Sequence, residues 1–306
     1  MRISKSSRGI QRDSNASLLR NAMFKYSAFS LTIDSELELT EFGPGTGEPH
    51  VRFRLGKIAG PLRPASISEE FVFPIGVGRF HILGGREIII DPAPESDPTM
   101  IRAMLQGRLI AYLLRQRGRF PLHCSGVLSG GGSLLFAGES GAGKSTTAAA
   151  FHQRGYRIFT DDIAALQVCD GGLLAAASWT GLRLSSESQT VMPPIAPSGF
   201  SDGKHIFRLE GDQPAPAVAV HRIYFLEYGP TPRPYIEKVP LPLSASLLHS
   251  NSFVRHWRAD AELIRINLNR SAAIAEFLRV RRIFRPRSFS ALNAVVDLVE
   301  EDIANG

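Results

Sequence analysis

The glycine-rich run Gly138-Glu-Ser-Gly-Ala-Gly-Lys-Ser145 constrains the fold more than any other feature, because it matches G-x-x-x-x-G-K-[ST] at every fixed position. An apolar stretch, 133–137, precedes the run, and a helix-forming stretch, 144–154, follows it. Its glycines allow backbone N–H groups to turn inward around an anion, at dihedral angles that a Cβ disfavours. The sequence therefore predicts a buried strand, a phosphate-binding loop and a helix, which form the core of an α/β fold. A glycine-rich turn that only caps a helix is the alternative.

The side chains of this loop supply the groups that bind a nucleoside triphosphate. The helix N-terminus and the Lys144 ammonium place positive charge beside the β- and γ-phosphates, and the Ser145 hydroxyl is a ligand for Mg²⁺. We therefore expect the nucleotide to contact the loop and the residue after it, namely Gly138, Glu139, Ser140, Gly141, Ala142, Gly143, Lys144, Ser145 and Thr146.

Two adjacent carboxylates, Asp161 and Asp162, follow a predicted strand over 156–160, seventeen residues after the loop lysine. One helix, one turn and one strand fill this interval, so we expect the strand to return beside 133–137. Side chains alternate along a strand, so one carboxylate can face a metal while its neighbour faces an incoming nucleophile. A turn in which the aspartates only end the strand is the alternative.

The chain divides into two predicted domains. Alternating apolar residues over 28–55, 71–77 and 87–90 indicate a small β-rich domain over 1–96, whose basic, serine-rich residues 1–25 we expect to be flexible; a transit peptide is the alternative. Asp97-Pro98 begins an amphipathic helix that Gly118 closes, and a catalytic domain over 97–306 starts there. Further strands are predicted over 163–168, 173–179 and 220–226, and helices over 271–280 and 288–303.

Composition and charge narrow the class of protein. The chain has 306 residues, of which 43% are hydrophobic, and no apolar run approaches the length of a membrane span. Its two cysteines cannot form a disulfide framework, so we expect a cytoplasmic protein; a homo-oligomer is left open. The net charge of +6 matches that of 251–287 alone, where nine arginines stand against three acids. This segment is either a solvated basic face or a site for an acidic partner, and nucleic acid is not expected because aromatic interleaving is absent.

Residues 192–217 hold five prolines and three glycines without periodicity, a composition typical of a functional lid or a disordered excursion. Lys204 and Arg208 lie in this segment. If it closes over a nucleotide, they bring positive charge to the transferred phosphoryl group; solvated loop charges are the alternative.

The pattern Leu122-His123, the glycine loop, Arg154-Gly155 and Asp161-Asp162 resembles the catalytic domain of bacterial HPr kinase/phosphorylase. It is more similar to the HPr-kinase-related enzymes of lasso-peptide gene clusters, which phosphorylate a serine of a precursor peptide. The resemblance is specific over 120–170, and Tyr26–Ser35 also resembles the short N-terminal domain of that subgroup. It implies a P-loop fold allied to phosphoenolpyruvate carboxykinase, ATP with Mg²⁺, and transfer to a serine hydroxyl of a peptide or small protein.

The resemblance also implies roles for individual residues. Asp161 matches the catalytic base, His123 its hydrogen-bonding partner, and Asp162 a carboxylate on the metal side with Ser145. Taken alone, a histidine on an apolar strand more often belongs to the core. The stretch 178–187 lacks the glycine-rich signature of true HPr kinases, which argues against HPr itself as the acceptor. A regulatory module with slow ATP hydrolysis and a small-molecule kinase are the competing interpretations.

Overall fold

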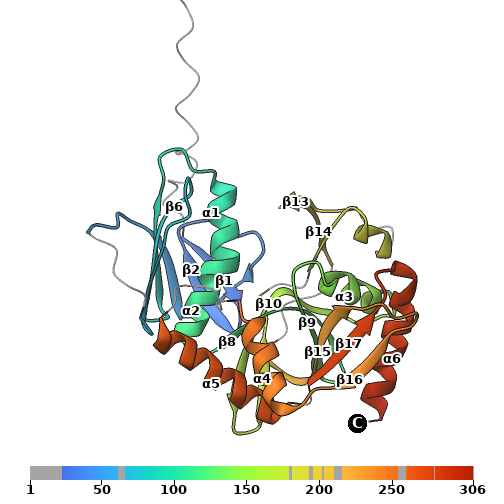
Figure 1. The fold of residues 1–306 in the computed structure, drawn as a ribbon. Coiled ribbons are helices and arrows are strands. Elements are labelled where there is room, and N and C mark those ends of the chain that lie inside the picture. Colours follow the sequence, from blue (N-terminus) through green and yellow to red (C-terminus); the bar gives the residue numbers. More distant parts are fainter. Residues whose placement is uncertain are drawn as a thin grey trace, which may run out of the picture.

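The computed structural model describes residues 23–60, 66–178, 181–192, 196–201, 203–209, 216–253, 260–278 and 280–305. Within these ranges the chain forms two seven-stranded sheets and one three-stranded sheet (Figure 1). Most of the predicted flexible terminus, part of the lid segment including Asp202, and Arg255, Arg258 and Arg279 of the basic segment lie outside the described residues. Of the helices in the described ranges, none carries an apolar stretch of the length that a membrane crossing needs.

The N-terminal sheet has the strand order β3-β1-β2-β4-β7-β6-β5. Its strands are β1 (Phe24–Ala28), β2 (Leu31–Ser35), β3 (Gly43–Pro44), β4 (Val51–Leu55), β5 (Glu69–Val72), β6 (Gly78–Leu83) and β7 (Glu87–Pro92). Alternation sets its faces: in β4, Val51 and Phe53 are buried while Arg52 and Arg54 are exposed. Strands β2, β4, β5 and β7 lie within or overlap the predicted ranges, whereas residues 37–42 form no strand and β1 and β6 were not predicted.

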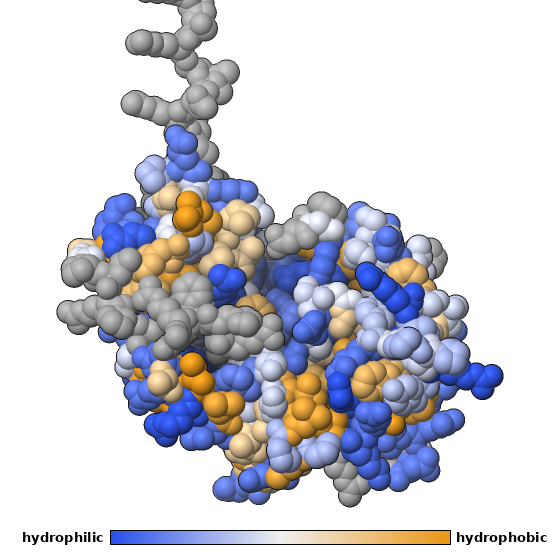
Figure 2. Space-filling model, in the orientation of Figure 1, coloured by the Kyte–Doolittle hydropathy of each residue, from blue (hydrophilic) through white to orange (hydrophobic). Residues whose placement is uncertain are grey.

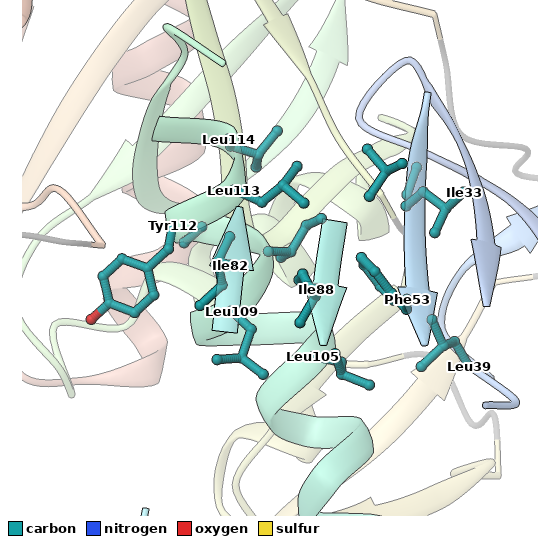
Figure 3. Packing of buried hydrophobic residues seen from close by; sticks show 14 of the residues in the cluster. Ile33, Leu39, Phe53, Ile82, Ile88, Leu105, Leu109, Tyr112, Leu113 and Leu114 are labelled. Atoms are coloured by element: carbon teal, nitrogen blue, oxygen red, sulfur yellow. The ribbon is translucent and has the colours of Figure 1, made fainter. Parts of the chain in front are cut away.

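A single helical run follows this sheet, made of α1 (Pro98–Met104), the π-helical turn η2 (Leu105–Leu109) and α2 (Ile110–Gln116). It begins as predicted, because the Asp97 side chain accepts a hydrogen bond from Thr99 N and Pro98 takes the first helical position. Its apolar face packs on the N-terminal sheet (Figure 3). The same core takes in Ile163 and Ala176 of the second sheet, so the two parts of the chain share buried contacts. The domain boundary between 96 and 97 stays a prediction.

The second sheet carries the glycine loop and has the order β11-β10-β8-β9-β15-β17-β16, with an additional pairing of β11 to β15. Its strands are β8 (Phe120–Ser129), β9 (Gly132–Ala137), β10 (Ile158–Cys169), β11 (Gly172–Ala176), β15 (Val218–Tyr228), β16 (Tyr235–Lys238) and β17 (Val280–Arg285). The remaining helices are α3 (Lys144–Gln153), η3 (Ser188–Val191), α4 (Leu241–Ser250), α5 (Ala261–Phe277), η4 (Phe289–Ala291) and α6 (Leu292–Ala304). The small sheet has the order β12-β14-β13, with β12 (Gly181–Leu184), β13 (Gly199–Ser201) and β14 (Lys204–Arg208).

The strand that carries the aspartates differs from the prediction in two ways. It does not end at Asp161: β10 runs through both aspartates as one strand. It also does not lie beside β9, because β8 lies between them. The tight turn at Gly130-Gly131 folds β8 back antiparallel on one edge of β9, and β15 pairs with the other edge, so β10 pairs with the far edge of β8.

The prediction of a helix over 271–280 is wrong at its end. Helix α5 stops at Phe277, and residues 280–285 form β17, which pairs in parallel with β15. Three arginines in this strand obscure its apolar pattern, yet the fold provides a partner for each. Arg281 bonds to Asp302, Arg282 to Glu227 and Arg285 to the carbonyl oxygen of Ala142, which makes their burial tolerable.

A buried cluster around Asp302 ties α6 to the second sheet and gives a stability prediction. Asp302 accepts hydrogen bonds from Arg222, Arg281 and the Tyr224 hydroxyl. Asp302→Ala leaves two buried guanidinium groups uncompensated, so we expect a loss of about 3–5 kcal/mol in unfolding free energy. Asp297→Ala removes an exposed pair with Arg154 and should cost less than about 1 kcal/mol in the same denaturant titration. Equal losses would contradict the buried role of Asp302.

The same cluster predicts a pH dependence. Burial raises the pKa of Asp302, but hydrogen bonds from Arg222 and Tyr224 outweigh it and leave the pKa below its ordinary value. A carboxylate with a depressed folded-state pKa stabilises the fold above its unfolded pKa of about 3.9, and the stabilisation is lost as the pH falls further. The stability difference between wild type and Asp302→Ala should therefore shrink below about pH 4.

Candidate active site

The glycine loop connects β9 to α3 in the predicted order of strand, loop and helix. Gly138, Gly141 and Gly143 all have positive φ values, of 143°, 85° and 87°. A Cβ on Gly138 would lie 2.8 Å from the carbonyl oxygen of Leu226 in β15, and a Cβ on Gly143 would lie 2.0 Å from the Arg285 guanidinium. Only glycine fits at these two positions, so the loop is held tightly against the neighbouring strands.

Lys144 begins α3 with its side chain folded back over the loop. Its Nζ donates to the carbonyl oxygens of Gly138 and Glu139 at 2.9 and 3.1 Å. Burial lowers the pKa of this ammonium, which means that its surroundings disfavour the charge. An anion in the loop would compensate that cost, so the environment of Lys144 fits a bound phosphate chain.

A cavity of about 540 Å³ opens over the loop. In the space-filling view, hydrophilic residues line a hollow between the N-terminal part of the molecule and the part that carries the loop (Figure 2). Among the predicted nucleotide contacts, Ser140, Gly141, Gly143, Lys144, Ser145 and Thr146 line this cavity. The other three are not part of the cavity lining. The carbonyl oxygens of Gly138 and Glu139 accept hydrogen bonds from Lys144, and that of Ala142 accepts a hydrogen bond from Arg285.

Asp161 lies beside the loop serine. Its carboxylate accepts hydrogen bonds from the Ser125 hydroxyl at 2.5 Å and from the backbone N–H of Arg183 at 2.7 Å, and the Ser145 side chain lies within hydrogen-bonding reach. Ser125 is its direct partner across the β8–β10 pair. Burial raises the pKa of Asp161 despite these hydrogen bonds. A cation beside the carboxylate would remove that cost of burial.

Asp162 pairs with His123 on the same side of the cavity. The His123 Nδ1 lies 3.2 Å from a carboxylate oxygen and 3.0 Å from the carbonyl oxygen of Asp162. Burial acts to raise the pKa of Asp162, but the hydrogen bond and charge of His123 and the charges of Arg183 and Lys204 outweigh it and lower the pKa. Asp162 also has a φ of 142°, a strained value for a residue with a side chain.

The two carboxylates therefore do not point apart as strand alternation predicted. Both line one cavity, because the backbone at Asp162 departs from regular strand geometry. The expected contact of His123 with Asp161 is replaced by a contact with Asp162, and Asp161 instead lies near Ser145. These contacts place the residues; the roles of the two aspartates remain a proposal.

Arg183 is a site residue that the sequence reading missed. It comes from β12, where the flanking Leu182 and Leu184 are buried and the alternation turns Arg183 toward the cavity. Its guanidinium bonds to Glu41 of the N-terminal region and lies 3.4 Å from Asp162. The alternation of leucine and arginine in β12 could have predicted that Arg183 faces away from the core. Its pairing with Glu41 could not be predicted, because the two residues lie far apart in the sequence.

Two strands of the small sheet, β13 and β14, belong to the predicted lid segment 192–217. Lys204 at the start of β14 lines the cavity, and its action on the phosphates stays a prediction. Arg208 at the other end of β14 does not reach the cavity and donates to the carbonyl oxygen of Thr40 at 2.5 Å. Arg183 and Arg208 thus tie the small sheet to the N-terminal residues 40–41. Closure of this segment stays a prediction, and residues 193–195, 202 and 210–215 lie outside the described chain.

The metal-binding capacity of the site rests on few donors. In the part of the chain that the structure describes, no group of three or more His, Cys, Asp or Glu side chains is arranged to hold a metal ion. Mg²⁺ typically takes one or two carboxylates from a protein and completes its shell with phosphate oxygens and water. The Ser145 hydroxyl and the buried Asp161 carboxylate, side by side beneath the loop, are donors of that kind.

Comparisons with known proteins give a limited result. No protein-family model matches the chain, and no curated protein matches it. Among solved structures, the chain matches the Hpr(Ser) kinase/phosphatase from Coxiella burnetii, at 15% sequence identity and a TM-score of 0.35. The match covers 60% of this chain and 97% of that chain.

Proposed function

We propose that the chain is an ATP- and Mg²⁺-dependent phosphotransferase that phosphorylates a serine hydroxyl of a peptide or small protein. One observation carries the proposal: the glycine loop with its buried lysine and two adjacent carboxylates line a single cavity. Phosphoryl transfer depends on positioning and charge stabilisation more than on covalent chemistry. A phosphate-binding loop beside carboxylates provides both.

In this proposal the two aspartates divide the work according to their contacts. Asp161 and Ser145 hold Mg²⁺, because P-loop enzymes bind this ion through the loop hydroxyl and a nearby carboxylate. The bound ion would offset the negative charge of the β- and γ-phosphates. Asp162, whose side chain is 29% exposed, faces the acceptor and takes its proton. The family resemblance implies the opposite order for the two aspartates, and a magnesium titration separates the two.

The remaining residues position the phosphates and the Asp162 carboxylate for the reaction. Lys144 exchanges its two loop carbonyls for phosphate oxygens, and His123 holds the Asp162 carboxylate toward the acceptor. The serine oxygen then bonds to the γ-phosphorus, the bond to the bridging oxygen of the leaving diphosphate breaks, and the hydroxyl proton passes to Asp162. Arg183 and Lys204 add positive charge on the side of the cavity where Asp162 lies.

The test of this function is transfer of labelled phosphate. The full chain is incubated with Mg²⁺, γ-labelled ATP and pairs of peptides that differ only by serine or alanine at one position. A lasso-peptide precursor is the first acceptor to try, because of the resemblance described above. Label on the serine peptide alone supports the proposal. Label released only as inorganic phosphate indicates a regulatory ATPase, and label on a small metabolite indicates a small-molecule kinase.

The contact between Glu41 and Arg183 predicts that the N-terminal region influences catalysis. Glu41→Gln removes the negative charge that pairs with the Arg183 guanidinium, and Arg183 contacts both aspartates. We therefore expect kcat to fall about tenfold with little change in the KM for ATP. Glu38→Gln changes an exposed acid three residues away and serves as the control. An unchanged kcat in Glu41→Gln, with equal melting temperatures, would contradict a positioning role for Glu41.

A further inference from the structure

The cavity continues past the loop on the side opposite the aspartates. Strands β15 and β17 run parallel to β9 and end beside the loop, and the cavity lining there includes Tyr228, Arg285, Arg287 and Phe289. The proposed transfer uses none of these residues. In open α/β sheets, ligands bind at the carboxyl ends of the parallel strands, so this end of the cavity is placed to hold part of a ligand.

Two of the four residues form a rigid support. Arg285 is buried, and its guanidinium donates to the Ala142 carbonyl at 2.9 Å and to the Tyr228 hydroxyl at 3.1 Å. Its Cζ also lies 4.6 Å from the centroid of the Tyr228 ring. Tyr228 is thereby fixed to the loop itself, so the position of the ring depends on the same carbonyl that shapes the phosphate cradle.

The other two residues are exposed at the cavity. Arg287 lies over the same ring, with its Cζ 5.5 Å from the Tyr228 centroid. The Phe289 side chain follows two positions later at the start of η4 and is 46% exposed. Both side chains line this end of the cavity, and an aromatic ring and a guanidinium plane are each groups on which a flat aromatic ligand can stack.

The strand order determines which part of the nucleotide reaches this surface. The sheet runs β10-β8-β9-β15-β17, so the aspartates and the aromatic residues lie on opposite sides of the loop strand. The γ-phosphate must lie on the side of the carboxylates, where transfer occurs. The nucleoside end of the same molecule therefore extends across the loop toward Tyr228 and Phe289.

We propose that Arg287 and Phe289 form the subsite for the nucleobase, which stacks on the Phe289 ring and the Arg287 guanidinium. Arg285 and Tyr228 hold this surface at a set distance from the phosphate cradle. The subsite rests on the proposed function, since it assumes that a nucleoside triphosphate occupies the loop. Stacking is tolerant of base identity, because every base presents an aromatic face.

The experiment compares two ligands that share the phosphate chain. Equilibrium binding of Mg·ATP and of Mg·tripolyphosphate, which lacks a nucleoside, is measured for wild type, Phe289→Ala and Arg287→Ala. We expect Phe289→Ala to raise the Kd for ATP about 5- to 100-fold and to leave the Kd for tripolyphosphate within about twofold. Phe289→Trp should restore ATP binding. Phe277→Ala removes a similarly exposed phenylalanine at the end of α5 and is the matched control.

The possible results distinguish a failure of the proposed subsite from a failure of the proposed function. If wild type binds neither ligand, the phosphate cradle and the subsite both fail. If wild type binds both and Phe289→Ala and Arg287→Ala leave ATP binding unchanged, the subsite is wrong while the proposed function stands. A variant that weakens both ligands equally also overturns the subsite, because the lost contact would then act on the phosphates or on the loop.

Discussion

Replacement of Lys144 by methionine is expected to lower phosphoryl transfer by at least about 10²-fold. Methionine keeps the apolar stem and removes only the charge, so packing in the loop changes little. The physical reason is that the ammonium lies against the start of the loop, where it would donate to phosphate oxygens in place of the Gly138 and Glu139 carbonyls. Charge stabilisation of this kind accounts for a large part of the rate in enzymes that transfer charged groups.

The same substitution should leave the fold intact. Burial lowers the pKa of Lys144, so its charge is not a source of stability, and the melting temperature of Lys144→Met should be close to that of wild type. Lys204→Ala is the comparison, because this exposed lysine lines the same cavity from the small sheet. It should reduce kcat more than ATP affinity, with a smaller overall effect. Full turnover in a folded Lys144→Met protein would rule out the loop as the phosphate site.

Neutralising each aspartate should produce two different losses. Asp162→Asn is expected to bind Mg·ATP normally and to lose about 10²- to 10⁴-fold in rate, the usual range for a general base. Asp161→Asn should instead raise the Mg²⁺ concentration needed for half-maximal rate, because its carboxylate lies near Ser145. His123→Ala should resemble a milder Asp162→Asn, since its contact is with Asp162.

Titration of Mg²⁺ against rate in each variant is the measurement. Asp170→Asn, in the exposed turn at the far end of β10, controls for the general effect of removing a charge. Melting temperatures control for lost hydrogen bonds, because a side-chain amide at this position could not accept from every donor that the Asp161 carboxylate now satisfies. If Asp161→Asn shows the pure rate loss and Asp162→Asn the magnesium effect, the order implied by the resemblance is correct and the contact-based assignment is wrong.

Several parts of the fold were accessible from the sequence because their causes are local. The loop glycines permit the backbone that the structure shows, since glycine adopts the positive φ values found at 138, 141 and 143 without the steric cost of a Cβ. The helical run beginning at Pro98 was predicted from its cap and its apolar spacing, and both features lie within a few residues of each other. Periodicity likewise identified β4, β7, β9 and β15, although their ends differ by a few residues.

The arrangement of the site required the tertiary structure. The family resemblance implied that His123 lies beside the aspartates, but which aspartate it contacts depends on β8 lying between β9 and β10 and on the strained backbone at Asp162. Arg183 meets Glu41 across 142 residues of sequence, and no local pattern encodes that contact. Strand β17 was missed because its arginines are acceptable in a buried strand only when partners such as Asp302 and Glu227 are already in place. Local geometry follows from each residue and its neighbours, whereas strand order and ion pairing depend on the free energy of all contacts formed together.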